Sequence, residues 1–444
     1  MNMLIQNNQL VLFIIAFSKS LRIFFFITAV LLAAEVCTNA ANVDTFGIGS
    51  KATALGGAFS AYADDPYAIH YNPAGLTRIS RITISGGTHL ILADINVGNY
   101  HVEGTDSSVN GSKDFSNNSD GLVVPHFGFV YPLSDKLVTG IAAYAPYGLD
   151  IEFDDNTAEN PGAFNNVHSY YNRMVITPAI SYRFSEKISG GFGISVGRSE
   201  CGVERLLYLP GTSFHEKKVE TELEDDFNYS FNAGIMYTPT DSLTLGLTFR
   251  SKADADFEGS AEVVGIPGSK TDIESSIDHP AQVQGGIRYQ PHSNFSLELD
   301  LVWTDWSTVD CYIISFTPPL LGVQTEDVCE REWEDTVQVR IGAEWALNDM
   351  VVLRGGYFYD PSPVPDKTFD LQWPDSDKKT YSFGMGLNFG NFSVDSVVQY
   401  IITEKNRYIG GESVELNRSY GGQNVSLNAD GEIWGFGITF NYVF

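Results

Sequence analysis

The chain has 444 residues, of which 27 are basic and 55 are acidic, for a formal net charge of −28. Such an acidic balance disfavours nucleic acids and anionic phospholipid surfaces as partners. Glycine is abundant, with 42 residues, and aromatic side chains make up 13% of the chain. This composition favours a β-barrel over a helical protein, and the charge by itself identifies no substrate.

The N-terminal region has the pattern of an export signal. Basic side chains precede the apolar run 23–34, and small residues follow it as far as Ala41. We interpret residues 1–40 as a signal peptide, which is removed on export. The alternative is a lipoprotein anchor at Cys37, which the acidic Glu35 just before it disfavours. No later run approaches the roughly 18 apolar residues that a spanning helix requires.

The segment 41–80 is irregular and semi-apolar. Its glycines, among them Gly56 and Gly57, and the turn Asn72-Pro73-Ala74 interrupt every regular period. Its alanine, phenylalanine and tyrosine side chains nevertheless make it too apolar for a solvated linker. Such a segment needs a container to bury it. We therefore expect it to form a hatch, or plug, inside a barrel built from residues 81–444.

From Arg81 onwards the dominant hydrophobic period is two, which is typical of β-strands. In the stretch Phe295–Trp303 the odd-numbered positions are apolar, whereas Glu298 and Asp300 lie on the other face. We expect the apolar face to meet lipid and the polar face to meet a lumen, because a charge at mid-bilayer costs about 2–4 kcal/mol. Fourteen such segments are predicted, at 81–103, 120–132, 136–146, 170–184, 187–208, 219–238, 242–260, 271–290, 294–312, 330–347, 350–360, 378–389, 392–408 and 428–444.

The connections between these segments alternate in length. The short ones are 132–135, 185–186, 239–241, 291–293, 348–349 and 390–391, and the long ones are near 104–119, 147–169, 209–218, 261–270, 313–329, 361–377 and 409–427. An even strand number with short periplasmic turns and long outer loops is the bacterial outer-membrane pattern. A closed barrel also leaves no unpaired strand edge in lipid. The sequence therefore predicts an all-β, 14-stranded antiparallel transmembrane barrel in the outer membrane of a Gram-negative bacterium, in contact with lipid and lipopolysaccharide.

The last strand alternates apolar and small residues up to the terminal Phe444. An ordinary edge strand is one explanation. A terminal aromatic residue after such alternation also suits transfer to a barrel-insertion machinery, which we expect to be a partner.

Several stretches resemble one family. They include Ala54-Leu-Gly-Gly-Ala-Phe59, Tyr71-Asn-Pro-Ala74, Trp303-Thr-Asp-Trp-Ser307 and Tyr359-Asp-Pro-Ser-Pro-Val-Pro365. Together with the fourteen strands and the aromatic C-terminus, they resemble the outer-membrane long-chain fatty acid transport family (FadL/TodX-type, OMPP1). The resemblance spans nearly the whole chain after the signal peptide, in the family's order.

The resemblance implies a channel for passive uptake of hydrophobic small molecules, long-chain fatty acids first. It also implies a hatch whose turn Asn72-Pro73-Ala74 constricts the lumen and shifts to relieve the block, followed by lateral release through the wall. An apolar solute that passes sideways out of the barrel into the membrane is stabilised by about 0.8 kcal/mol for each methylene that is transferred from water to hydrocarbon. The alternatives are a channel of the same fold for monoaromatic or alkane hydrocarbons, a general porin, and a surface adhesin or receptor.

A lateral exit needs an interruption in the hydrogen-bonded wall, and proline lacks the donor that a paired strand requires. Pro125, Pro146 and Pro178 fall in or at the ends of three neighbouring predicted strands. We predict that the ladder is bulged or open there. The alternative is that each proline marks the true end of a strand.

Three cysteines remain after the signal peptide, so a fully paired disulfide framework is excluded. Cys311 and Cys329 bracket one polar segment and are predicted to form a disulfide, which export permits. Unpaired thiols are the alternative, and Cys201 is expected to be free in a strand.

The resemblance implies substrate contacts among the outer loops and near the N-terminal end of the hatch. The apolar candidates are Phe46 and Ile48 in the hatch, and Tyr147, Phe153 and Phe164 in the predicted loop 147–169. Pocket walls are mostly apolar, although aromatic loop residues also pack against one another. A carboxylate ligand would need an inward basic side chain, for which the candidates are Arg250, Arg288 and Arg340.

Catalytic and metal-binding constellations do not stand out. Asp64-Asp65 fits a turn or a cap, and the eight histidines show no metal-ligand spacing. The acidic pairs Asp254/Asp256 and Asp375/Asp377 fit solvated loops better than cation sites. We therefore expect no enzymatic activity, no cofactor and no metal.

Overall fold

The computed structural model describes residues 47–104 and 112–444. The predicted signal peptide and the candidate Phe46 lie outside the described residues.

Nine wall strands are continuous: β1 (Thr83–Val102), β3 (Leu122–Pro132), β4 (Leu137–Glu152), β5 (His168–Arg183), β6 (Ile188–Leu206), β7 (Lys218–Thr240), β16 (Val351–Asp360), β17 (Lys378–Phe389) and β20 (Val425–Val443). Five more are each divided into two parts: β8 (Leu243–Arg250) with β9 (Asp256–Val263), β10 (Thr271–Ser276) with β11 (Gln282–His292), β12 (Phe295–Thr304) with β13 (Cys311–Leu320), β14 (Gln324–Glu330) with β15 (Thr336–Ala346), and β18 (Phe392–Thr403) with β19 (Arg407–Gly410).

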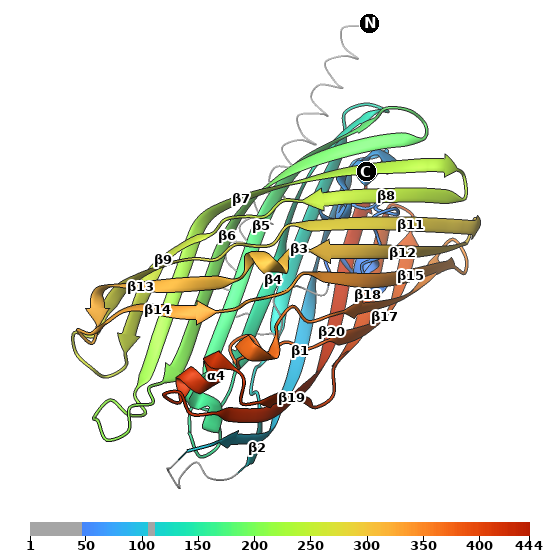
Figure 1. Ribbon diagram of the computed structural model, residues 1–444. Coiled ribbons are helices and arrows are strands. Elements are labelled where there is room, and N and C mark those ends of the chain that lie inside the picture. Colours follow the sequence, from blue (N-terminus) through green and yellow to red (C-terminus); the bar gives the residue numbers. More distant parts are fainter. Residues whose placement is uncertain (1–46, 105–111) are drawn as a thin grey trace, which may run out of the picture. The chain divides into compact units, whose positions relative to one another are not determined.

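These strands form a closed antiparallel barrel (Figure 1). Each wall strand pairs with its neighbours in chain order, and β1 pairs with β20 from Thr83↔Val443 to Val102↔Val425, which closes the ring. The predicted 14-stranded antiparallel barrel is thereby confirmed. The short strand β2 (Lys113–Ser116) lies outside this order and pairs with β1.

The side chains alternate as the period of two predicts. Leu297, Leu299 and Leu301 are 42%, 45% and 51% exposed on the outer surface of the barrel, whereas Glu298 and Asp300 are buried inside it. Because lipid solvates apolar but not charged groups, this alternation is the one that a membrane wall requires. The last strand follows the same pattern as far as the exposed Phe444.

Four neighbouring wall strands are interrupted at a common level, at 251–255, 277–281, 305–310 and 331–335. Beyond the interruptions, β9, β10, β13 and β14 continue the sheet at the end that carries the long loops (Figure 1). The predicted loop 313–329 is therefore wrong, because most of it forms the β13–β14 hairpin.

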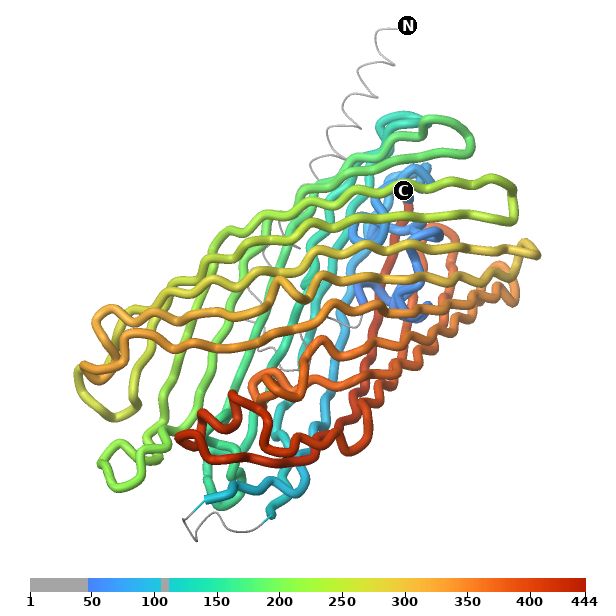
Figure 2. Tube along the Cα trace, viewed as in Figure 1, coloured from blue at the N-terminus to red at the C-terminus, as the bar shows by residue number. Residues whose placement is uncertain are grey.

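Residues 47–80, here called the N-terminal segment, lie inside the ring of strands (Figure 2). They form the short helices α2 (Ser50–Ala54), α3 (Ala68–Tyr71) and η1 (Pro73–Arg78). Hydrogen bonds tie the segment to opposite parts of the wall. The backbone N–H of Ser60 donates to Asp300 of β12 (3.1 Å), and that of Ser50 donates to Thr439 of β20 (2.9 Å). Across residues 47–104 and 112–444, no helix is long and apolar enough to cross a membrane.

The helical turns η2 (Pro161–Phe164), η4 (Asp366–Thr368) and α4 (Val414–Ser419) belong to the long loops. The turn η3 (Trp306–Thr308) lies in the interruption 305–310 of a wall strand. A large hydrophobic cluster joins these loops to the inner faces of the strand extensions.

Cys311 and Cys329 are both free thiols, so the disulfide predicted between them is wrong. The register pairs Cys311 with Glu330 and Cys329 with Tyr312. Since neighbouring residues of a strand point to opposite faces, the two thiols lie on opposite sides of the hairpin. Cys311 is exposed and Cys329 is buried. Cys201 is free in β6, as expected.

Candidate functional site

A cavity that is partly open to solvent lies between the N-terminal segment and the inner wall. We call it the arginine cavity, because Arg173, Arg250 and Arg340 line it. Apolar and aromatic side chains alternate with these bases around the lining. They are Ile48 and Tyr71 from the N-terminal segment, and Tyr144, Pro146, Tyr147, Val175, Phe231, Pro280 and Phe358 from the wall and its connections. The cavity therefore combines an apolar surface with three guanidinium groups and one carboxylate, that of Asp360.

Arg173, Arg250 and Arg340 each donate hydrogen bonds to neutral oxygens. Arg173 donates to the side chains of Asn228 (2.8 Å) and Ser230 (3.2 Å). Arg250 donates to the side chain of Gln282 (2.7 and 3.0 Å) and to the carbonyl of His70 (2.9 Å).

Arg340 donates to the side-chain oxygen of Gln338 (2.5 and 3.1 Å). Amide and hydroxyl oxygens orient these bases. Burial, together with Arg250 and Arg340, lowers the pKa of the neighbouring His70 well below its usual value. His70 is therefore neutral at pH 7, and the arginines supply the positive charge of the cavity.

Of the predicted substrate-binding residues, the structure brings Ile48, Tyr147, Arg250 and Arg340 together in this cavity. Phe153 and Phe164 instead pack in the hydrophobic cluster of the loops, which was the alternative for aromatic loop residues.

Arg288 lies apart from the cavity lining, with its guanidinium 3.5 Å from the centre of the Tyr62 ring. The sequence analysis missed Arg173. It lies on β5 in a stretch with a period of two, so the rule that charged residues point inward would have found it.

The N-terminal segment meets the wall through the turn Asn72-Pro73-Ala74. The Asn72 side chain accepts a hydrogen bond from the Ala74 N–H (3.1 Å) and donates to the carbonyls of Ser60 (2.7 Å) and Ile235 (3.2 Å). The turn packs against two glycines of the wall, Gly191 and Gly234. A Cβ at Gly234 would lie 2.1 Å from Asn72 Oδ1, so this close approach requires glycine.

Gly56 and Gly57, the other predicted hatch residues, form the turn after α2. Their φ angles are 64° and 71°, in the left-handed region that favours glycine. The Gly57 carbonyl accepts a hydrogen bond from Gln284 (3.1 Å), and Gly56 lines the arginine cavity. This turn therefore forms part of the cavity wall.

The three predicted prolines coincide with irregularities in the strand ladder. The β3–β4 ladder ends at Phe127↔Ala143, two residues from Pro125, although both strands continue toward the long loops. The β4–β5 register shifts between Tyr144 and Tyr147, on either side of Pro146. In the β5–β6 ladder, the pairs skip Pro178.

Nearer the loops, the segment before β3 contacts the end of β4, because the Asn118 N–H donates to the Glu152 carbonyl (2.7 Å). A window without ladder pairs thus lies between the level of Phe127 and that of Asn118. The apolar residues Leu122, Val124, Ala145 and Phe358 cluster there. Since Phe358 also lines the arginine cavity, the window and the cavity adjoin.

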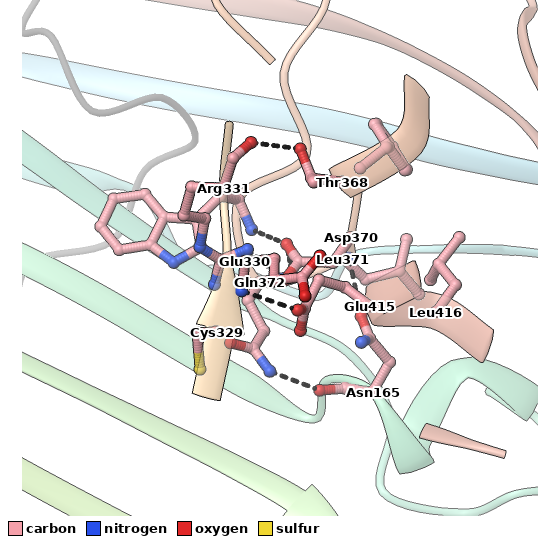
Figure 3. Close-up of polar contacts among 12 residues, drawn as sticks. Asn165, Cys329, Glu330, Arg331, Thr368, Asp370, Leu371, Gln372, Glu415 and Leu416 are labelled. Atoms are coloured by element: carbon pink, nitrogen blue, oxygen red, sulfur yellow. Dashed lines mark hydrogen bonds and ion pairs between the residues drawn. The ribbon is translucent and has the colours of Figure 1, made fainter. Parts of the chain in front are cut away.

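A buried ion pair connects two segments at the long-loop end (Figure 3). The Arg331 guanidinium lies 2.7 Å from the Asp370 carboxylate, and both side chains are almost completely buried. Thr368 donates a hydrogen bond to the Arg331 carbonyl, and the Glu330 N–H donates to the Glu415 carboxylate (2.9 Å). The connection after β14, the loop around η4 and helix α4 are therefore held together.

In the described part of the chain, no group of three or more His, Cys, Asp or Glu side chains is placed to hold a metal ion.

These features define a class of protein: a transmembrane β-barrel with a segment of its own chain in the lumen and an internal cavity beside an interrupted wall. Residues 29–444 match the outer membrane protein transport protein family (OMPP1/FadL/TodX), and the chain belongs to this family. It is thus an outer-membrane protein of a family of transport proteins, not of enzymes.

Similar proteins extend over nearly the whole chain. The long-chain fatty acid transport protein of Escherichia coli (strain K12) is 24% identical, over 89% of this chain and 93% of its own. Outer membrane protein P1 of Haemophilus influenzae (strain Rd) is 26% identical, over 85% and 89% of the two chains.

Among solved structures, a FadL homologue of Pseudomonas aeruginosa matches with a TM-score of 0.76 and 19% identity, over 91% of this chain and 100% of that one. The Pseudomonas putida toluene transporter TodX matches with a TM-score of 0.70 and 16% identity, over the same shares of the two chains. At these identities, the two structures support the fold.

Proposed function

We propose that this protein is a channel for uptake of long-chain fatty acids across the outer membrane. The observation that carries the proposal is the arginine cavity, where three guanidinium groups face a partly apolar space. A fatty acid needs a site for a carboxylate and a site for a hydrocarbon chain, and a buried cavity that offers both favours it over an uncharged hydrocarbon. Relatives named as long-chain fatty acid transport proteins support the same substrate class.

The arginines suit a carboxylate because guanidinium donors bind it through paired, charge-assisted hydrogen bonds. Gln282 and Gln338 already orient Arg250 and Arg340, so little side-chain freedom is lost on binding. A carboxylate would exchange these neutral acceptors for a charged one, in a site of reduced dielectric where the attraction is stronger than in water.

The window between β3 and β4 supports lateral release. The acyl chain would pass from the arginine cavity over Phe358 to Leu122 and Val124, and from there into lipid. This route keeps the chain on apolar surface at each step, and leaving water for hydrocarbon gains about 0.8 kcal/mol per methylene.

The N-terminal segment would act as the hatch. It closes the lumen beneath the cavity, and its Ile48, Gly56 and Tyr71 form part of the lining. A ligand that displaces these residues would disturb the contacts of Asn72-Pro73-Ala74 with the wall. We therefore propose that binding and hatch movement are coupled.

The experiment compares oleate binding to the purified barrel in detergent, by calorimetry, for Arg340→Gln and Arg250→Gln. Arg288→Gln is the matched control, because it removes the same charge outside the cavity. Loss of one charge-assisted hydrogen bond, worth about 1.5–3 kcal/mol, should weaken oleate binding about 10- to 150-fold in the two cavity variants. The control should bind as the wild type does.

The affinity for methyl oleate, which has the same chain without the charge, should not change with any of the three substitutions. Equal effects of Arg340→Gln and Arg288→Gln would contradict the proposal. Binding of toluene without binding of oleate would assign the channel to hydrocarbons instead.

A further inference from the structure

One carboxylate, that of Asp360 at the end of β16, lines the arginine cavity together with the three bases. The residue is buried, with only 8% of its surface exposed. A ligand carboxylate bound by the arginines would share the cavity with this group, and like charges repel strongly in a site of reduced dielectric. Asp360 would therefore oppose the binding of a fatty acid unless its charge is compensated.

The neighbouring strands determine what surrounds Asp360. On one side, the ladder between β16 and β17 places Lys378 directly opposite it. On the other side, the side-chain amide of Gln338 in β15 donates a hydrogen bond to Asp360 (2.8 Å), and its oxygen accepts from Arg340 (2.5 and 3.1 Å). Gln338 thus links the carboxylate to the guanidinium, and both Gln338 and Asp360 line the arginine cavity.

Lys378 compensates the charge of Asp360 from outside the arginine cavity. Its ammonium lies 3.5 Å from the Asp360 carboxylate, and its side chain is almost completely buried. Asp375, in the loop before β17, holds the same ammonium at 2.6 Å. Lys378 and Asp375 line a neighbouring cavity, which Gln338 and Asp360 separate from the arginine cavity. Asp375 therefore positions the ammonium without adding its own charge to the arginine cavity.

From this arrangement we infer that Lys378 is a positioning residue for carboxylate recognition, because it keeps the Asp360 charge paired and away from the arginines. The inference rests on the proposed fatty acid function, since it concerns the charge preference of the same site. Without the Lys378 ammonium, the Asp360 carboxylate would displace Gln338 from Arg340 and occupy the donors that a fatty acid needs. Lys378 thus favours anionic over uncharged ligands without contacting them.

The test compares the binding of oleate and methyl oleate to the purified barrel in detergent, by calorimetry. Lys378→Met should weaken oleate binding by about tenfold, because Asp360 then repels the ligand and competes for Arg340. The affinity for methyl oleate should not change. Lys379→Met is the matched control, since it removes the same charge from the next residue, which is exposed on the opposite face of β17. The control should bind both ligands as the wild type does.

The double variant Lys378→Met/Asp360→Asn separates this role from a structural one. Removal of the Asp360 charge should restore the affinity for oleate, whereas a packing defect caused by the methionine would remain. Asp360→Asn alone can still accept the hydrogen bond from Gln338, and it should bind oleate at least as tightly as the wild type does.

The inference is overturned if Lys378→Met binds oleate as the wild type does, if it weakens both ligands equally, or if Asp360→Asn does not restore oleate binding in the double variant. A weaker affinity of Asp360→Asn alone for oleate would also overturn it. Arg340→Gln distinguishes this failure from that of the fatty acid proposal. A wild type that prefers oleate to methyl oleate, and loses the preference in Arg340→Gln, supports the fatty acid proposal whatever Lys378→Met does. A wild type without that preference contradicts both.

Discussion

Tyr147 stacks on His279, with ring centroids 5.2 Å apart and an interplanar angle of 28°, between the arginine cavity and a smaller cavity lined by Trp306, Trp333 and Trp373. His279 is held in place by hydrogen bonds to the Tyr171 hydroxyl and, at 3.2 Å, to the Ala253 carbonyl. Tyr147 follows Pro146, where the β4–β5 register shifts. The stacked pair thus separates the two cavities at an irregular point of the wall.

Replacement of this barrier should speed ligand entry. Tyr147→Ala removes the ring that both cavities share, and we expect oleate to associate up to about tenfold faster, equivalent to about 1.4 kcal/mol in the barrier. The affinity should change less, because the arginines remain. Stopped-flow fluorescence with a labelled fatty acid measures the rate. Tyr147→Phe, which keeps the stacked ring, is the control, and an unchanged rate in Tyr147→Ala would show that ligands do not pass this point.

A cross-link across the window should block lateral release. Val124→Cys and Ala145→Cys, in a Cys311→Ser background, would place two thiols in the apolar cluster where the β3–β4 ladder ends. Oxidation should stop uptake of labelled oleate by cells, while binding to the purified protein persists. Reduction of the same protein should restore uptake. If the oxidised and reduced proteins transport equally and mass spectrometry confirms the disulfide, the exit lies elsewhere.

Removing one partner of the buried ion pair Arg331–Asp370 should lower the unfolding free energy more than removing both partners. Arg331→Met leaves the Asp370 carboxylate buried without its partner, and we expect a loss of about 3–5 kcal/mol in unfolding free energy. Asp370 also accepts hydrogen bonds from the N–H groups of Gln372 and Trp373 (3.1 and 2.9 Å), which an asparagine can still accept.

The double variant Arg331→Met/Asp370→Asn should therefore be more stable than Arg331→Met alone. Denaturant-induced unfolding, followed by tryptophan fluorescence, measures the difference. A double variant as unstable as the single one would show that the lost packing of Arg331, not the unpaired charge, dominates.

The docking of the N-terminal segment should weaken as the pH rises. Burial raises the pKa of Asp65 from 3.8 to about 7, against the opposing effect of Lys51. The form in which the N-terminal segment is docked on the wall therefore binds the Asp65 proton more tightly than a form in which the segment is undocked. Its relative stability falls between about pH 4 and pH 7 and stays low above that range.

In the Asp65→Asn variant, the side chain at this position is neutral at every pH and can still accept the hydrogen bond from the Tyr67 N–H (2.8 Å). At pH 8 we expect it to dock the segment more tightly than the wild type, by up to about 2 kcal/mol for this half-buried group. The difference should vanish below pH 4. The urea concentration at which a protease cleaves residues 47–80 reports docking. Asp64→Asn, which loses the ion pair with Lys51 (2.6 Å), should have the opposite effect.

Much of the architecture could be predicted from local patterns. The alternation in Phe295–Trp303 determines which side chains meet lipid, because each strand must satisfy that requirement along its own length. Proline likewise disrupts pairing wherever it occurs, so Pro125 and Pro146 marked irregular points of the ladder correctly. Arg250 and Arg340 were expected to face inward for the same reason that Glu298 was.

Relationships between strands could not be predicted in this way. The disulfide prediction failed because the hairpin register pairs Cys311 with Glu330, and a shift of one residue reverses the face. Phe153 and Phe164 were predicted to lie in the same loop as Tyr147, but Tyr147 lies in β4 and, of the three, it alone lines the arginine cavity.

The barrel, its strand number and the inward or outward direction of the strand side chains could be predicted from the sequence, because they depend on the local solvent of each residue. Which inward residues meet depends on the folded barrel. Ile48 and Arg340 share a cavity because ring closure and the folding of the N-terminal segment bring them together across nearly three hundred residues. Trp306 and Trp333 likewise meet because neighbouring strands are interrupted at matching levels, and that alignment is a property of the assembled sheet.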